Sequence, residues 1–153
     1  MYSLSWNEFE TLAMEVAKKI QNSEKTFDIV VAVSRGGLLL GRLLSSMLEL
    51  PMGVISAKEM DGKYYVDDYI STIYDIEGNV LLVDDVFEET GNLIIKKIKK
   101  NYPKINNVTL ACLLYKSTSN FKVEFSINKV EKKLNIIFPY QEDKINKSYK
   151  YLF

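Results

Sequence analysis

The sequence contains no histidine and only one cysteine among its 153 residues. The missing imidazole excludes the most common general base, the histidine-dependent catalytic triads and most zinc sites. Any chemistry must therefore use carboxylates, lysine, arginine, tyrosine or backbone dipoles. The single thiol, Cys112, cannot form an internal disulfide, and its apolar neighbours predict a buried side chain in a reducing cytoplasm.

Net charge and long apolar runs are missing as well. The 20 basic and 20 acidic side chains cancel, which argues against a protein that grips nucleic acid or an anionic membrane. No apolar stretch approaches the roughly 20 residues of a membrane-spanning helix, and residues 1–10 lack the basic and apolar regions of a secretion signal. The length and the 47% apolar content predict one soluble cytoplasmic domain.

Apolar patterning predicts strands that alternate with helices. Short continuous apolar runs predict buried strands at 27–33, 52–57, 79–85 and 107–115. Helical spacing predicts helices at 6–21, 38–50 and 91–102, the first of them begun by a capping box at Ser5 and Glu8. Further strands are expected at 121–127, with one exposed face, at 134–140, and near 70–74 after a loop or hairpin. This order predicts a single α/β domain with a parallel sheet flanked by helices.

Two unusual loops follow two of the predicted buried strands. The segment "SRGG" occupies residues 34–37, and "DDVFEETGN" occupies residues 84–92. In an open parallel sheet, ligands bind beyond the carboxyl ends of the strands, so both loops should face one crevice.

Both loops have features of anion sites. Residues 90–92 begin a predicted helix, whose free backbone N–H groups and positive dipole end suit a phosphate. Gly36 and Gly37 allow backbone amides to approach a second anion, to which Arg35 adds charge. The loops therefore predict a ligand with two anionic ends.

Four carboxylates stand within residues 84–89, between these anion sites. Asp84 and Asp85 suit ribose hydroxyls or a hydrated Mg²⁺. The combination predicts a ligand with phosphate at one end, a sugar in the middle and a metal-bound polyphosphate at the other end.

Taken together, these segments resemble the type I phosphoribosyltransferases over almost the whole chain. "VLLVDDVFEETGN" is similar to the family's thirteen-residue signature for phosphoribosyl pyrophosphate, and "VAVSRGG" to its pyrophosphate loop. "SWNEFETLAMEVAKKI", "LLYKSTSNF" and "IIFPY" resemble the small 6-oxopurine branch, which contains the xanthine-guanine and hypoxanthine-guanine enzymes. The resemblance implies one phosphoribosyltransferase domain over 1–153, with a mobile active-site loop at about 58–69 and a nucleobase hood at about 116–153. It also implies a homodimer or homotetramer.

The resemblance also implies a role for individual residues around phosphoribosyl pyrophosphate. Pyrophosphate would be held by Ser34, Arg35, Gly36 and Gly37, and the Ser34–Arg35 bond is often a non-proline cis peptide in this family. The 5′-phosphate would be held by Thr90, Gly91 and Asn92. The ribose 2′ and 3′ hydroxyls would be held by Asp84 and Asp85, directly or through Mg²⁺.

The purine would lie at the other end of the site. Lys116 would donate a hydrogen bond to the exocyclic O6 of the base, and the base would be framed by the backbone around Ile136 and by the ring of Phe138 or Tyr140. The implied reaction is Mg²⁺-dependent purine salvage, in which a glycosyltransferase converts a free purine to its nucleoside monophosphate and releases pyrophosphate.

The chain departs from the family pattern at three places. Four residues separate the acidic pair from Thr-Gly where the family usually has three. Aligning on Thr-Gly makes Glu89 the carboxylate that handles the proton of the purine, whereas aligning without a gap makes it Glu88 and puts Glu89 in the phosphate pocket. An anion there would repel the phosphate, so we expect Glu89. Leu93 stands where the family usually has a hydroxyl that binds the 5′-phosphate. Asn135 stands where it usually has a tryptophan that stacks on the base.

These departures leave two alternatives open. One is an adenine-specific version of the same reaction, which Asn135 favours. The other is a protein of this fold that binds phosphoribosyl pyrophosphate or nucleotides as a sensor, without efficient turnover.

Overall fold

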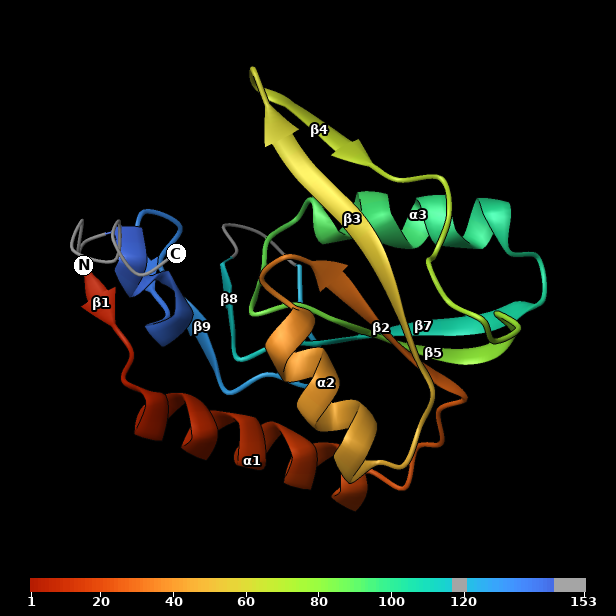
Figure 1. Ribbon diagram of the computed structural model, residues 1–153, viewed down its shortest axis with the longest axis horizontal. Coiled ribbons are helices and arrows are strands. Elements are labelled where there is room, and N and C mark those ends of the chain that lie inside the picture. The colour runs from red at the N-terminus through yellow and green to blue at the C-terminus, as the bar shows by residue number, and fades with distance from the viewer. Residues whose placement is uncertain (117–120, 145–153) are drawn as a thin grey trace, which may run out of the picture.

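The computed structural model describes residues 1–116 and 121–144, and its centre is a five-stranded sheet with the order β4-β3-β2-β5-β7 (Figure 1). The strands are β2 (Ile29–Ser34), β3 (Met52–Met60), β4 (Lys63–Val66), β5 (Gly78–Val83) and β7 (Ile105–Ala111). Strands β3, β2, β5 and β7 are parallel, and only β4 runs antiparallel to its neighbour. The predicted parallel α/β domain is confirmed.

Helices cover both faces of this sheet. Helices α1 (Trp6–Asn22) and α2 (Leu38–Met47) pack on one face, and α3 (Gly91–Asn101) packs on the other. Successive side chains of a strand point to opposite faces, so Val30 joins the α1/α2 core while Val31 joins the α3 core. Two covered faces explain why the central strands are continuous apolar runs.

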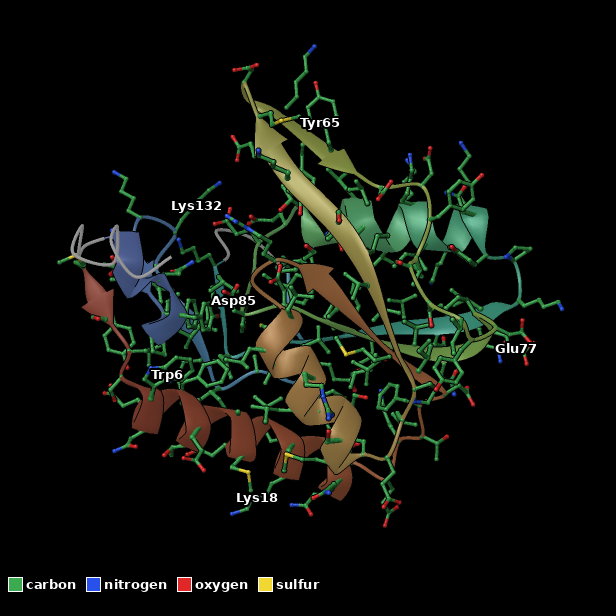
Figure 2. The ribbon with its side chains drawn as sticks, viewed as in Figure 1. Trp6, Lys18, Tyr65, Glu77, Asp85 and Lys132 are labelled. Atoms are coloured by element: carbon green, nitrogen blue, oxygen red, sulfur yellow. The ribbon has the colours of Figure 1, made fainter. Side chains whose placement is uncertain are left out.

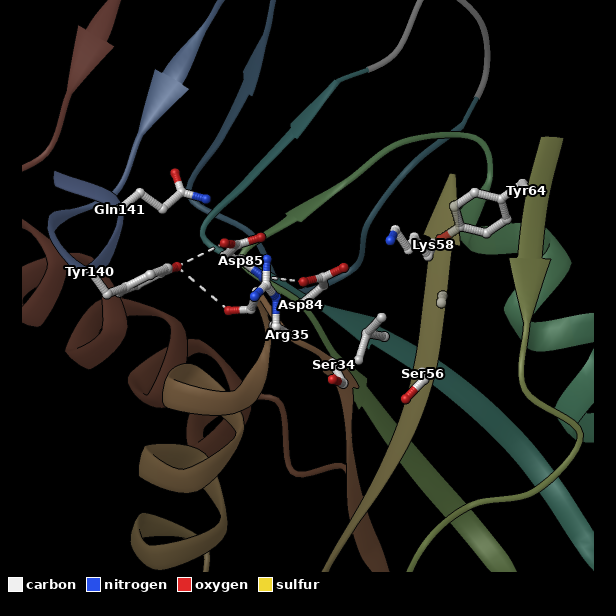
Figure 3. Close-up of a pocket in the computed structure, with 12 residues that line it drawn as sticks. Ser34, Arg35, Ser56, Lys58, Tyr64, Asp84, Asp85, Tyr140 and Gln141 are labelled. Atoms are coloured by element: carbon white, nitrogen blue, oxygen red, sulfur yellow. Dashed lines mark hydrogen bonds between the residues drawn. The ribbon is translucent and has the colours of Figure 1, made fainter. Parts of the chain in front are cut away.

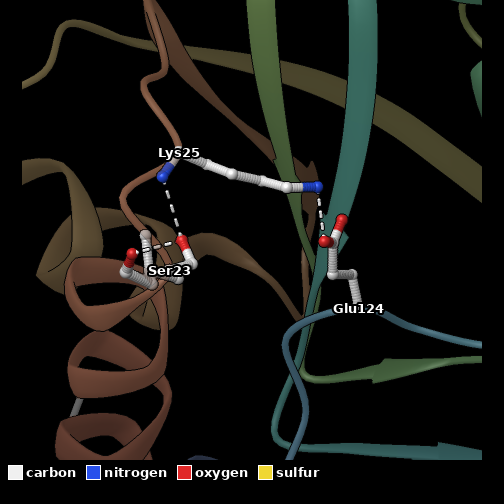
Figure 4. Close-up of polar contacts among 4 residues, drawn as sticks. Ser23, Lys25 and Glu124 are labelled. Carbon is white, nitrogen blue, oxygen red and sulfur yellow. Dashed lines mark hydrogen bonds and ion pairs between the residues drawn. The ribbon is translucent and has the colours of Figure 1, made fainter.

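The ends of α1 are fixed by polar contacts. At its start the predicted capping box is present, because the Glu8 amide donates to Ser5 Oγ at 3.2 Å and the Ser5 amide donates to Glu8 Oε2 at 2.7 Å. Beyond its last turn, the Lys25 amide donates to Ser23 Oγ, and the Lys25 ammonium pairs with Glu124 on a distant segment (Figure 4). No helix of the described residues is long and apolar enough to cross a membrane.

A hairpin occupies the segment that was predicted to be a loop or a hairpin. Strand β3 continues to Met60 and returns as β4 through Asp61 and Gly62, which both have positive φ, 52° and 73°. Such φ values are typical of the two-residue turns that match strand twist. Figure 2 shows the hairpin projecting from the sheet with Tyr65 near its tip. Its mobility stays a prediction.

Small strands form a second layer beside the carboxyl end of the main sheet. Strands β6 (Val86–Phe87), β8 (Leu114–Lys116) and β9 (Asn128–Val130) form a parallel sheet with the order β6-β8-β9. Strand β1 (Tyr2–Ser3) pairs in parallel with β10 (Ile136–Ile137), and the 3₁₀ helix η1 (Pro139–Lys144) follows. The predicted hood at 116–153 corresponds in part to this layer, although 117–120 and 145–153 lie outside the described residues.

Four strand predictions need correction. The strand predicted at 107–115 is two strands in different sheets, because beyond Ala111 the Cys112 amide donates to the Phe125 carbonyl and the Leu113 amide to that of Asp85. The segment 121–127 is not a strand and makes only one bridge, between Ala111 and Phe125. Its alternating pattern instead buries Val123 and Phe125.

The run predicted at 134–140 is a strand only at 136–137, since Pro139 has no N–H to continue a ladder. The strand predicted near 70–74 is a single bridge between Ser71 and Val54. Strand β1 was not predicted, because two residues show no periodicity.

Candidate active site

Two adjoining cavities lie beyond the carboxyl ends of the central strands. The larger encloses about 870 Å³ and the smaller about 310 Å³. Both are lined by Tyr64, Asp84, Asp85 and Gln141, so together they form one crevice. Figure 2 shows Asp85 between the main sheet and the second layer, and Figure 3 shows the larger cavity in detail. The predicted common crevice for the two loops is confirmed by this arrangement.

The loop at 34–37 forms one wall of the larger cavity. Ser34, Arg35 and Gly36 line it, and the Ser34–Arg35 peptide bond is cis. Gly37 is pressed against the end of β5, and its amide donates to the Val33 carbonyl at 2.9 Å. The glycines therefore bring this backbone against the acidic loop.

The acidic pair forms the floor between the two cavities. Asp85 is only 9% exposed, and Asp84 is half-buried. The Asp85 amide donates to Asp84 Oδ1 at 2.8 Å, and the Val86 amide donates to Asp85 Oδ1 at 2.7 Å. Burial, followed by the charge of Asp85, raises the pKa of Asp84 well above its usual value. Two carboxylates are thus crowded at one site, and a cation or hydroxyl donors bound there would stabilise their charged forms.

This pair fits Mg²⁺ as far as its donor set goes. Mg²⁺ in nucleotide sites is usually held by one or two carboxylates, while substrate phosphates and waters complete its shell. No cluster of three or more acidic, histidine or cysteine ligands occurs in the described residues. Asp84 and Asp85 could therefore hold the ion only together with oxygens from a substrate or water.

The loop at 88–93 is a tight turn rather than an open set of amides. The amides of Gly91, Asn92 and Leu93 donate to the carbonyls of Glu88, Glu89 and Thr90, at 2.9, 3.1 and 3.0 Å. The expectation of free N–H groups at residues 91–93 is wrong, because the turn satisfies these amides internally. A phosphate would have to share or replace these bonds.

Tyr64 connects the hairpin to this loop. Burial raises the pKa of Tyr64, the nearby Thr90 side chain opposes that rise, and the carboxylates around it, Asp84 foremost, add to it. Sequence analysis missed Tyr64, as it did Lys58 and Gln141, because nothing in the pattern of the hairpin or the C-terminal region distinguishes them. The resemblance placed the segment 58–69 at the site, but it did not distinguish Tyr64 from the adjacent Tyr65.

The smaller cavity contains most of the residues that were assigned to the base. It is lined by Lys116, Asn135, Ile136 and Phe138. Glu88 also lines it, and its Oε1 lies 3.8 Å from Lys116 Nζ. Glu89 is not among the residues that line either cavity, so its assignment to proton transfer stays a prediction and Glu88 becomes the better-placed carboxylate.

Tyr140 is placed differently from the other residues assigned to the base. It lines the larger cavity and not the smaller one, and its hydroxyl donates to Asp85 Oδ2 at 2.7 Å (Figure 3). Its ring is stacked on Phe138, with the centroids 5.5 Å apart. Phe138 therefore faces the base end of the crevice, while Tyr140 faces the acidic pair.

Comparison with known proteins supports one family. The sequence model of the phosphoribosyl transferase domain matches residues 4–144. An adenine phosphoribosyltransferase of Mycoplasmopsis synoviae is 28% identical over 133 residues, 74% of this chain and 73% of that protein. A purine phosphoribosyltransferase structure from Pyrococcus horikoshii is 27% identical, with a TM-score of 0.77 over 92% of this chain and 93% of that chain.

A xanthine-guanine-hypoxanthine phosphoribosyltransferase from Helicobacter pylori shares the fold, with a TM-score of 0.78 over 95% of this chain and 97% of that chain, at 21% identity. The family match spans both loops of the crevice, the acidic pair and the hairpin between them. The chain therefore belongs to the phosphoribosyl transferase domain family.

Proposed function

We propose that the protein is a purine phosphoribosyltransferase of nucleotide salvage. It transfers the 5-phosphoribosyl group from phosphoribosyl pyrophosphate to a free 6-oxopurine and releases pyrophosphate. The observation that carries this proposal is one crevice with a glycine loop at one end, two aspartates on its floor and Lys116 at the other end. The similarity to the Pyrococcus horikoshii purine enzyme over most of both chains supports it.

The binding roles follow the order of groups in the substrate. Residues 34–37 hold the pyrophosphate, and residues 90–92 hold the 5′-phosphate after the turn amides exchange their internal bonds. Asp84 and Asp85 hold the ribose hydroxyls or a metal ion. Mg²⁺ at this pair, when bound, would neutralise charge on the pyrophosphate and help it leave.

The reaction needs a stabilised leaving group and a tolerated cationic sugar. The bond between C1′ and the pyrophosphate oxygen breaks, its electron pair leaves with the pyrophosphate, and a purine nitrogen forms the new bond to C1′. Arg35 stabilises the departing charge, and the carboxylates on the floor tolerate the positive charge that develops on the ring. A carboxylate at 88 or 89 accepts the proton that leaves N7 of the purine.

Lys116 favours a 6-oxopurine over adenine. Its side chain is 18% exposed and is paired loosely with Glu88, so its ammonium is directed to the smaller cavity. An ammonium donates to an exocyclic oxygen, whereas the amino group of adenine would present a donor to a donor. The adenine version remains the second candidate, since the Mycoplasmopsis synoviae relative is an adenine enzyme and Asn135 lines the same cavity.

The test is a steady-state assay of pyrophosphate release. Phosphoribosyl pyrophosphate and Mg²⁺ are offered with hypoxanthine, guanine, xanthine and adenine in turn. We expect turnover with a 6-oxopurine, and we expect Lys116→Met to lower kcat/KM for that base while the exposed helix variant Lys99→Met leaves it unchanged. Preference for adenine would support the second candidate. No turnover with any base, together with calorimetric binding of phosphoribosyl pyrophosphate, would leave a sensor.

The proton-transferring carboxylate is identified by a pair of variants. Glu88→Gln and Glu89→Gln are neighbouring and isosteric, so each serves as the control of the other. The variant that removes the acid–base group should lower kcat about 100-fold or more while phosphoribosyl pyrophosphate still binds. On the position of Glu88 in the smaller cavity, we expect Glu88→Gln to show this loss.

A further inference from the structure

Aromatic neighbours fix the ring of Tyr140 on three sides. It is stacked on Phe138, with 4° between the ring planes, and it meets the edge of Phe9, with the centroids 5.8 Å apart. Trp6 lies beside it, with the centroids 6.3 Å apart. A half-buried ring held in this way can direct its hydroxyl to only a small region.

That hydroxyl is directed at the acidic pair. It donates to Asp85 Oδ2 at 2.7 Å and lies 3.5 Å from the Gly36 carbonyl. A phenol has one proton, and the short distance assigns that proton to the carboxylate. The other oxygen of Asp85 accepts from the Val86 amide, so both oxygens of this carboxylate have a donor.

Gly36 packs against another side of the carboxylate. A Cβ placed on Gly36 would lie 2.5 Å from Asp85 Oδ1 and 2.7 Å from its Cγ, so the glycine backbone is packed directly against the carboxyl group. Tyr140, Gly36 and Val86 thus hold Asp85 from three directions, while its carboxylate still lines both cavities. Tyr140 is the member that connects the second layer of the fold to the floor of the crevice (Figure 3).

We propose that Tyr140 is a positioning residue for phosphoribosyl pyrophosphate, which acts by holding the Asp85 carboxylate in the orientation that receives the ribose. This inference rests on the proposed function, and it moves Tyr140 from the base to the sugar. The hydroxyl does not touch the reacting atoms. Its contribution is to keep one carboxylate fixed, so that the remaining lone pairs of Asp85 meet the sugar or its metal ion without rearrangement.

The decisive variant is Tyr140→Phe, because it keeps every ring contact and removes only the hydroxyl. A hydrogen bond to a charged group corresponds to a change of roughly tenfold or more in affinity. We expect the KM for phosphoribosyl pyrophosphate to rise by about that factor, while kcat and the KM for the base change less than about threefold. The matched control is Tyr115→Phe, since Tyr115 packs edge-on against Phe121 and lines neither cavity.

A double-mutant cycle separates positioning from a general structural role. Calorimetry measures binding of phosphoribosyl pyrophosphate with Mg²⁺ to Tyr140→Phe, Asp85→Ala and the double variant, and circular dichroism establishes that each is folded. If Tyr140 acts through Asp85, adding Tyr140→Phe to Asp85→Ala should weaken binding less than about twofold. An equal loss in both backgrounds would overturn the inference, as would wild-type affinity in the single variant.

The outcomes also separate this inference from the proposed function. If the wild-type protein binds phosphoribosyl pyrophosphate but turns over no base, the salvage function fails and the calorimetric cycle still decides the role of Tyr140. If the wild-type protein does not bind phosphoribosyl pyrophosphate, both are overturned. If it turns over a 6-oxopurine and Tyr140→Phe is indistinguishable from Tyr115→Phe, the inference alone is overturned.

Discussion

The substitution Gly37→Ala should remove a large part of the stability of the protein. A Cβ at this position would overlap the carbonyl oxygen of Val83 and lie 2.9 Å from both Asp84 Cα and the Val33 carbonyl oxygen. All three atoms are backbone at the ends of the paired strands β2 and β5, so no side chain can rotate to make room. Overpacking a core costs 1–3 kcal/mol or more when the backbone must move, and we expect about 3 kcal/mol or more here. The free energy of unfolding of a typical domain is only about 5–15 kcal/mol.

Gly36→Ala is the informative comparison, because its obstacle is a side chain. The three atoms nearest the added Cβ all belong to the Asp85 carboxylate, which can rotate at the expense of its bonds to Tyr140 and Val86. We expect a stability loss of about 1–2 kcal/mol, since a lost hydrogen bond to a charged group is partly offset by the lower entropy of the unfolded chain. The loss in free energy of binding phosphoribosyl pyrophosphate should be larger than the loss in free energy of unfolding.

The assay is urea unfolding followed by far-ultraviolet circular dichroism, with calorimetry for the ligand. Gly62→Ala is the control, because Gly62 has open space around it and its φ of +73° predicts a loss of about 1 kcal/mol from backbone conformation alone. The order of destabilisation should be Gly37→Ala above both other variants. A Gly37→Ala protein as stable as Gly62→Ala would refute the reasoning from backbone contacts.

Four further outcomes are expected. Leu93→Thr, at a side chain that is 48% exposed, should lower the KM for phosphoribosyl pyrophosphate about tenfold in the steady-state assay, with a stability loss below about 1 kcal/mol. Burial and the charge of Asp85 raise the folded-state pKa of Asp84 above its unfolded value of about 3.9. The free energy of unfolding should therefore fall as pH rises from the unfolded pKa of Asp84 to its folded pKa. Urea titrations should find Asp84→Asn more stable than wild type at neutral pH, although inactive. Chelation by EDTA should abolish pyrophosphate release, and added Mg²⁺ should restore it. Lys97→Ala should change the free energy of unfolding, measured by urea titration, by less than about 1 kcal/mol, because the ion pair of Lys97 with Asp68 is solvent-exposed.

The central sheet could be predicted from sequence because its middle strands, β2 and β5, are covered on both faces. The run 29–33 is apolar and buried throughout, and few other structures impose that requirement. The second layer could not be predicted in the same way. Its strands have two or three residues each, too few to show a period, and they are held by pairing with one another and by the carbonyl of Asp85. These partners are distant in sequence and invisible to local pattern.

The candidate site shows the same division. Each of its two loops is one continuous segment of sequence, and the residue types within each loop predict its chemistry without knowledge of the fold. The role of Tyr140 depends on how η1 approaches the loop after β5, which no local pattern encodes. The choice between Glu88 and Glu89 depends on the path of a tight turn, and alignment on Thr-Gly alone could not fix which carboxylate lines a cavity.

The parallel pairing of β1 with β10 makes the base end of the crevice dependent on contacts between the most distant parts of the described chain. Tyr2 and Ser3 pair with Ile136 and Ile137, and the Leu4 amide donates to the Ile137 carbonyl. Closing so long a loop carries an entropy cost that the surrounding packing must offset, so we expect this edge to form after the central sheet and to open before it. During synthesis, residues 2–4 have no strand to pair with until residues 136–137 have emerged. We therefore expect the two loops to be in place first, and the base end and the Tyr140 contact to Asp85, which both depend on residues from β10 onward, to be completed last.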